Sequence, residues 1–278
     1  MSLLAVIRIS RPVFAPTLWL SIAVLIIVAL WALFPGHFSP QDPLAGDPLQ
    51  ALQPPSAQHW FGTDHLGRDI YSRSVHGTAL TLQATLFSVA IAFLLGSGIG
   101  VLGGYVRGRF DNLLMRLIDI LMAVPGLLLA MAIITVLGFG TLHIAVAVGL
   151  SSVATFARLS RGEVLRARNH LFVEAARTGG VGHLTIIRRH ILPHALPPVL
   201  SLAALELGFA LLSVSALSFL GFGAPPPQPE WGLLLAEGRN YIAAAWWYTT
   251  LPGATIALTV LATNRVASFI QDYAEELC

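Results

Sequence analysis

Six long apolar runs constrain the fold of this sequence more than any other feature. They cover residues 17–34, 79–103, 113–137, 141–156, 198–220 and 248–270. A helix needs about 20 mainly apolar residues to cross the hydrocarbon core of a bilayer. The third run contains Pro125, which we expect to kink its helix. The pattern predicts an all-α integral membrane protein with six transmembrane helices.

The composition agrees with a chain that has lipid as a main solvent. Of the 278 residues 55% are hydrophobic and 11% are charged, whereas soluble domains have about 25% charged residues. The net charge of +2 is too small to argue for nucleic acid as a partner, so we expect membrane lipid instead. Cys278 is the only cysteine, so we expect neither a disulfide framework nor a cysteine-based metal site within one chain.

The arginines, which make up all 16 basic residues, predict the orientation in the membrane. If the N-terminus is cytoplasmic, the cytoplasmic segments hold Arg8, Arg11, Arg107, Arg109, Arg116, Arg158, Arg161, Arg166, Arg168, Arg177, Arg188 and Arg189. Only Arg68, Arg73 and Arg239 then lie outside, with Arg265 in or near the last run. Positive residues are enriched in cytoplasmic loops. We therefore expect both termini in the cytoplasm.

The same spans divide the chain into two parts. Residues 1–78 are expected to form a cytoplasmic N-terminal segment, the first transmembrane helix and a proline-rich outer loop. Residues 79–278 are expected to form a five-helix core that includes a cytoplasmic loop at 158–195. A second outer segment, 222–247, leads into Trp246-Trp247-Tyr248, an aromatic cluster typical of a membrane interface, with contact to substrate as the alternative.

The cytoplasmic loop has the pattern of two short helices joined by a turn. Residues 170–177 favour a helix, and Gly179-Gly180 can supply the positive φ that ends it. A second helical stretch can follow up to Pro193, where the fifth span can begin. The small Ala175-Ala176 face suits close docking into a groove on a soluble partner. The alternative is an ordinary basic surface helix.

The loop resembles the ATPase-docking loop in permeases of binding-protein-dependent ABC importers. The shared pattern is Glu-Ala-Ala, a glycine six residues after the glutamate, and Ile-Leu-Pro. In this sequence it consists of Glu174, Ala175, Ala176, Gly180, Ile191, Leu192 and Pro193. The resemblance implies a type I ABC importer permease fold, with a coupling helix between spans four and five that sits in a cleft of a nucleotide-binding subunit.

A second resemblance narrows the family to the peptide- and nickel-type importer permeases. The outer-loop signature before the second span consists of Gly62, Thr63, Asp64, His65, Leu66, Gly67, Arg68 and Asp69. The stretches 103–125 and 218–223 and Glu230-Trp231-Gly232 are similar to the same subfamily. The resemblance implies a bacterial inner-membrane subunit that pairs with a second, different permease, two ATP-binding subunits and an extracytoplasmic binding protein.

The outer-loop signature also has a purely structural interpretation. Gly62 and Gly67 can punctuate a turn, and Asp64, Arg68 and Asp69 can pair locally. This interpretation stands beside direct contact with the binding protein or substrate.

Two patterns inside the apolar runs concern helix packing. Gly96, Gly100 and Gly104 recur every four residues, which permits close packing within the subunit or with its partner. Arg116 and Asp119 are spaced i, i+3 on the third run, so we expect an ion pair between them.

Glu206 is a candidate residue of the transport pathway. It lies near the middle of the fifth run, where a carboxylate is costly and usually faces a partner or a water-filled cavity. A structural hydrogen bond is the alternative. Substrate identity is also open: the segment Ala57-Gln58-His59-Trp60 resembles the nickel-type members, which slightly favours nickel or a metal chelate, and small peptides are nearly as well supported. His59, His65 and His76 in the same region could meet a metal ion, and the alternative is that they are ordinary loop histidines.

We expect no enzyme active site and no resident metal or cofactor in this chain. It has no Gly-x-Ser-x-Gly motif and no reactive-cysteine constellation, and without lysine it cannot form a P-loop. ATP and Mg²⁺ must then be bound by partner ATPases. The rival class is a secondary transporter, which also has Gly- and Pro-broken helices, but such a protein needs no docking loop.

Overall fold

A computed structural model describes residues 16–39 and 41–277, with side chains described as far as residue 272. Apart from two isolated β-bridges, the regular structure in these residues is helical. Arg8, Arg11 and Cys278, which entered the sequence predictions, lie outside the described residues.

The helices coincide with the apolar runs, and α3, α6, α9 and α11 extend beyond them. The long ones are α1 (Pro16–Leu33), α3 (Ile70–Val106), α6 (Thr141–Arg168), α9 (Leu192–Leu217) and α11 (Trp247–Leu277). The shorter ones are α2 (Pro35–Phe38), α4 (Gly108–Met122), α5 (Gly126–Leu137), α7 (Leu171–Thr178), α8 (His183–Ile186) and α10 (Trp231–Gly238). Turns of 3₁₀-helix lie at Pro48–Gln50 and Arg239–Tyr241, and turns of π-helix at Ile187–Ile191 and Ser218–Phe222.

The prediction of six spans is confirmed, with one change in form. In the described part of the chain five helical stretches are long and apolar enough to cross a membrane, and the bent pair α4–α5 can count as a sixth. The bend between α4 and α5 is 95°, so the expected kink in the third span is confirmed, and it is sharp enough to divide the span into two helices. Pro125 lies at this break, because proline lacks the N–H that would continue the helix and disfavours helical backbone at the residue before it.

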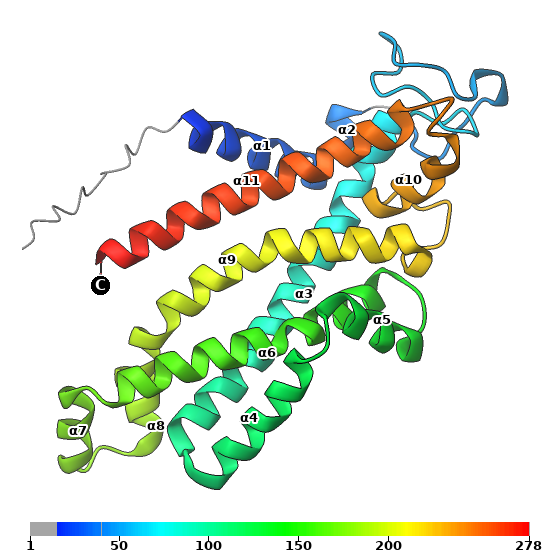
Figure 1. Cartoon of the computed structure of the whole chain (residues 1–278). Helices are drawn as coiled ribbons and strands as arrows, with labels where there is room; N and C mark the ends of the chain where they lie inside the picture. Colours follow the sequence, from blue (N-terminus) through cyan, green and yellow to red (C-terminus); the bar gives the residue numbers. More distant parts are fainter. Residues whose placement is uncertain (1–15, 40, 278) are drawn as a thin grey trace, which may run out of the picture.

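α3 packs most extensively on α6, and it also crosses α9 (Figure 1). The glycine repeat makes this contact possible. A Cβ atom added at Gly96 would lie 2.6 Å from the carbonyl oxygen of Val153, and one at Gly100 would lie 2.5 Å from that of Ala157. At Gly104 it would lie 2.9 Å from Val164 Cγ1. The repeat therefore serves packing within this chain, the first of the two alternatives.

The fourth span is longer than the sequence suggests, because α6 continues past residue 156 to Arg168. The arginines of α6 do not end the helix, because three of them form ion pairs with carboxylates. Arg158 pairs with Asp119, Arg161 with Asp111 and Arg166 with Glu163. The expected ion pair between Arg116 and Asp119 is therefore wrong, because the Asp119 carboxylate on α4 pairs with Arg158 on α6 instead. The connecting loop starts only after Arg168, not at 158.

The aromatic cluster at the start of α11 is mostly buried. Trp246 is 55% exposed, but Trp247 is 7% and Tyr248 is 0% exposed. The latter two pack with Ile70 and with Phe61 of the outer loop. The expectation of a membrane-interface cluster is therefore wrong for Trp247 and Tyr248, which fix the outer loop to α3 and α11.

Candidate functional site

The loop between α6 and α9 is fixed to the ends of three long helices. Figure 1 places α7 and α8 together, beyond the ends of α6 and α9. Val173 of α7 is completely buried. It belongs to a cluster with Val164, Ala167, Ile186, Ile191 and Ala195, against which Val101 and Tyr105 of α3 also pack. Through this cluster α7 packs against the ends of α3, α6 and α9.

The residues of the docking motif divide into two groups. Glu174 and Ala175 are exposed on α7, and the Glu174 carboxylate has no partner in the part of the chain that the structure describes. Ala176 and Ile191 instead face the buried cluster. Gly180 has φ of +76°, as the turn required. Leu192 and Pro193 begin α9, where a proline is tolerated in the first turn. The motif thus combines solvent-exposed residues of α7 with residues that pack α7 against the buried cluster.

The structure adds two residues to this outward face that the motif did not include. Leu171 is 83% exposed and Phe172 is 39% exposed at the start of α7. The ring of Phe172 packs with those of His170 and His194. The sequence did contain a signal, because two consecutive large apolar residues at the start of a short polar-loop helix are unusual unless something covers them.

Tyr105 joins the end of α3 to the same loop. Its hydroxyl lies 2.6 Å from His183 Nδ1, and the guanidinium carbons of Arg168 and Arg177 lie 5.4 Å and 5.8 Å from its ring centroid. These distances allow cation–π contacts. The loop is therefore connected to α3 by polar contacts as well as by apolar packing.

At the opposite end of the long helices, a buried ion cluster joins the outer loop to α3 and α10. Arg73 Nη1 lies 2.7 Å from Asp64 Oδ2 and 2.7 Å from Glu237 Oε2. Arg68 Nε lies 2.6 Å from Asp64 Oδ2, and Arg68 Nη2 lies 3.5 Å from Glu237 Oε2. Arg73 and Asp64 are completely buried. The local pairing of Asp64 with Arg68 is confirmed, but the pairing of Arg73 with Glu237 was missed because these residues are 164 positions apart.

Asp64 is held as a carboxylate by its neighbours. Burial alone raises the pKa of Asp64, but the backbone N–H groups of Arg68 and Leu66 and the guanidiniums of Arg68 and Arg73 outweigh it. The pKa of Asp64 therefore lies below its ordinary value of 3.8. The ion pairs of the cluster are intact at neutral pH.

The rest of the outer-loop signature shapes the turn. Gly62 and Gly67 have φ of +73° and +75°, which glycine adopts without strain. The Asp69 carboxylate caps α3 by accepting from Ser72 N at 2.6 Å. The Thr63 hydroxyl donates to the backbone of the loop at 2.5 Å. The structural interpretation of these residues is supported, and contact with a partner stays a prediction.

Glu230 begins α10 in a similar way. Its side chain is completely buried and accepts from the backbone N–H groups of Gly232 and Leu233 at 3.2 and 3.3 Å, and from the Ser218 hydroxyl. Burial raises the pKa of Glu230, although these hydrogen bonds oppose it. Trp231 Nε1 donates to the Ser74 carbonyl at 2.9 Å, so this motif docks α10 on α3.

Glu206 lies on α9 and faces α6, where it accepts a hydrogen bond from Ser152 Oγ at 2.5 Å. The structural alternative therefore has a partner, and a role in the pathway stays a prediction. The three outer histidines do not converge: His59 contacts Asp69, His65 contacts Tyr248, and His76 contacts the Ser72 carbonyl. Among the described residues, no three histidine, cysteine or acidic side chains are grouped to hold a metal ion.

Comparison with known proteins gives a consistent result. The family described as "Binding-protein-dependent transport system inner membrane component" matches residues 96–276. The probable D,D-dipeptide transport system permease protein DdpC of Escherichia coli (strain K12) is 39% identical over 91% of this chain and 85% of its own length. The glutathione transport system permease protein GsiD of Pectobacterium atrosepticum is 38% identical over 91% and 83%. The di/tripeptide transport system permease protein DppC of Pseudomonas aeruginosa is 40% identical over 89% and 84%.

Solved structures support the fold. A chain of the MetNI methionine ABC transporter in an inward-facing conformation superposes with a TM-score of 0.57 at 20% identity, over 74% of this chain and 94% of its own. A chain of an amino acid ABC transporter gives a TM-score of 0.58 at 19% identity, over 73% and 94%. The expected type I importer permease fold is confirmed.

Proposed function

Because this chain belongs to the binding-protein-dependent transport system inner membrane components, and is thus a membrane permease of an ABC importer, we propose that it imports small peptides. The relatives named above are permeases for dipeptides, di/tripeptides or glutathione. The nickel alternative rested on the resemblance of residues 57–60 to nickel-type members, with His59, His65 and His76 as possible metal contacts, and in the structure these three histidines have separate partners. The pathway would form between this chain and a second, different permease, and Glu206 is its candidate residue here.

The main support for an ATP-driven mechanism is α7, which has one solvent-exposed face and packs with the other against a buried apolar cluster. Glu174 lacks a partner among the described residues, Leu171 is 83% exposed, and Val173 behind them is buried against α6, α8 and α9. Such a face suits the groove of an ATP-binding subunit. Two such subunits would bind ATP and Mg²⁺, close on ATP, and rotate the spans through α7 to alternate access between the two sides.

The proposed orientation follows from the arginine distribution. The α7 end would be cytoplasmic, and the Asp64 end would face a binding protein outside the bacterial inner membrane. Both termini would be cytoplasmic. The outer-loop signature from Gly62 to Asp69 would then lie where the binding protein docks.

The experiment is purification of the tagged chain from its native membrane in mild detergent, followed by identification of the proteins that accompany it. We expect a second permease and P-loop ATPases, and ATP-dependent uptake of dipeptides once the binding protein is added to reconstituted vesicles. A chain that purifies alone and transports without ATP would instead be a secondary transporter.

A further inference from the structure

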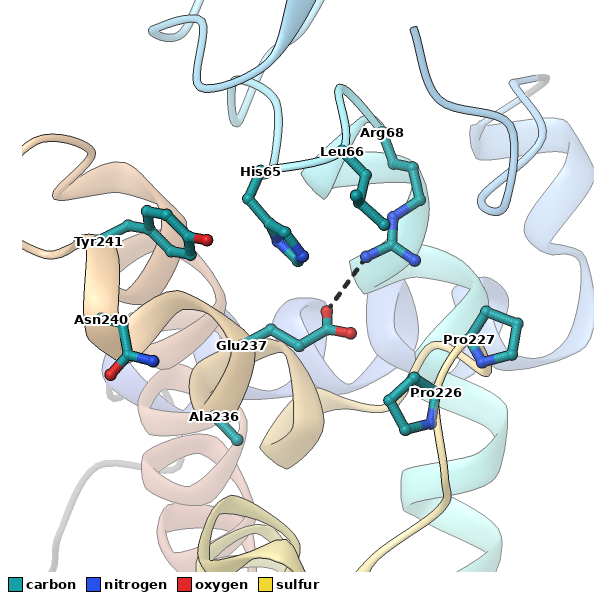
Figure 2. A pocket seen from close by; sticks show the side chains of 9 residues that line it. All are labelled: His65, Leu66, Arg68, Pro226, Pro227, Ala236, Glu237, Asn240 and Tyr241. Carbon is teal, nitrogen blue, oxygen red and sulfur yellow. Dashed lines mark hydrogen bonds and ion pairs between the residues drawn. The ribbon is translucent and has the colours of Figure 1, made fainter. Parts of the chain in front are cut away.

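A pocket of about 510 Å³ opens beside the ion cluster at the outer end of the molecule (Figure 2). This volume lies within the range of about 300–1,000 Å³ found for small-molecule sites. Its polar lining comes from His65 and Arg68 of the outer loop, Glu237 of α10, and Asn240 and Tyr241 just after it. The pocket therefore lies between two outer segments that are distant in the sequence.

Both signs of charge reach this pocket. Glu237 Oε2 accepts hydrogen bonds from Arg73, Arg68 and the Tyr248 hydroxyl, while Glu237 Oε1 has no hydrogen-bond partner in the described part of the chain. Arg68 donates from Nε to Asp64 and from Nη2 to Glu237, and its Nη1 makes no hydrogen bond to the described residues. Figure 2 shows the Glu237 carboxylate and the Arg68 guanidinium side by side at the pocket. One acceptor and one donor are thus free for a ligand.

The formal charges of the cluster select the kind of ligand. Two guanidiniums, Arg68 and Arg73, face two carboxylates, Asp64 and Glu237, so the cluster is balanced without a ligand. A free metal cation or a simple anion would disturb this balance in a partly desolvated place, which is costly. A zwitterion adds no net charge and offers an ammonium and a carboxylate, one for each free group.

The other wall of the pocket is flat and aromatic. The His65 ring is stacked on Tyr241, with centroids 5.4 Å apart and planes at 12°, and it is also within 3.2 Å of the Tyr248 hydroxyl. Asn240 is exposed and its side chain has no hydrogen bond to the described residues. This wall provides an apolar surface for a side chain and an amide for a peptide group.

We propose that this pocket is an outer binding site for a short peptide with free termini. Glu237 receives the ammonium, Arg68 receives the carboxylate, and the His65–Tyr241 stack contacts a side chain. The inference rests on the proposed peptide transport and adds to it a place where the peptide is held before it enters the membrane pathway.

The test measures dipeptide binding to the complete transporter in lipid nanodiscs, without the binding protein, by isothermal titration calorimetry. The probes are Ala-Phe, its N-acetyl form and its C-terminal amide. We expect Ala-Phe to bind at least about tenfold more tightly than either capped form, which corresponds to about 1.4 kcal/mol for each lost charge contact.

Ala236→Leu is the decisive variant, because Ala236 lines the pocket without belonging to the ion cluster. We expect it to weaken Ala-Phe binding by at least about tenfold. Ala243→Leu is the matched control, since Ala243 is exposed nearby and does not line the pocket, and it should bind as the wild type does. Retained ATPase activity shows that both variants are folded.

Three results would overturn the proposal: no binding of Ala-Phe by the wild type, equal binding of the capped forms, or wild-type binding by Ala236→Leu. If Ala236→Leu instead abolishes only the docking of the binding protein, the pocket accepts a side chain of that protein and not the peptide. Uptake is measured in parallel. Peptide uptake without binding in the pocket refutes this inference alone, whereas absence of ATP-driven peptide uptake refutes the proposed function.

Discussion

Arg73 is a buried charged residue whose guanidinium is only partly hydrogen-bonded. Its side chain is completely buried, and its Nε and Nη2 atoms have no hydrogen-bond partner among the described residues. Only Nη1 is paired, with Asp64 and with Glu237. Removing one partner of a buried ion pair leaves a charge that water cannot reach. The end of the molecule that holds this ion cluster therefore depends on both carboxylates.

We predict that Asp64→Asn lowers the stability of the outer region by about 3–5 kcal/mol at pH 7. The pKa of Asp64 is lowered in the folded state, so its stabilising effect is present above pH 3.8 and is lost as the pH falls through the lowered pKa. Thermal unfolding in detergent should show a large difference from the wild type at pH 7 that narrows below about pH 4. Equal unfolding temperatures at pH 7 would contradict this account.

At the scale of the elements, the glycine face of α3 determines how closely α6 approaches. Gly100 meets the Ala157 carbonyl, whereas Gly98, two residues earlier, has no atom within 4 Å of an added Cβ. The same substitution at the two positions therefore separates packing from the general cost of changing a helical glycine.

We predict that Gly100→Val forces α3 and α6 apart and lowers the free energy of unfolding by about 1–3 kcal/mol. Gly98→Val should cost little or nothing by comparison. The measurement is the unfolding temperature of each purified variant, together with the fraction that elutes as a single species. Similar values for both variants would show that the close approach does not limit stability.

α7 is the second element with a specific prediction. Glu174→Ala removes the exposed carboxylate, and Gly180→Val strains a backbone with φ of +76°. We predict that both reduce ATP-driven peptide uptake about tenfold or more, as truncation of an interface hot spot does, with ATP hydrolysis retained. Thr178→Ala is the control, because its hydroxyl bonds only the backbone of its own helix. Normal uptake by both variants would rule out α7 as the docking helix.

At the scale of the whole molecule, the two ends of the helices have different chemistry. One end has α7 and the arginines of α6, and the other has the outer loop, the ion cluster and α10 (Figure 1). The proposed orientation makes a direct prediction for each end. The single native cysteine, Cys278, makes labelling simple once it is replaced.

We predict opposite labelling of two cysteines introduced into a Cys278→Ser background. Leu49→Cys, at a position 90% exposed in the outer loop, should react with a membrane-impermeant maleimide in intact spheroplasts. Leu171→Cys, at a position 83% exposed on α7, should react only after permeabilisation. The reverse pattern would invert the topology and place α7 outside the reach of a cytoplasmic ATPase.

The sequence alone determined the span count, the turn at Gly180 and the helix over α7, because each depends on local hydropathy or local backbone preference. It also identified the pairing of Asp64 with Arg68, which are four residues apart. Only the tertiary structure decided that Asp119 pairs with Arg158 and that Arg73 meets Glu237, which is 164 residues away. Such pairs depend on which helices become neighbours. The same holds for the length of α6, which continues to Arg168, and two arginines of its extension pair with Asp111 and Asp119 of α4.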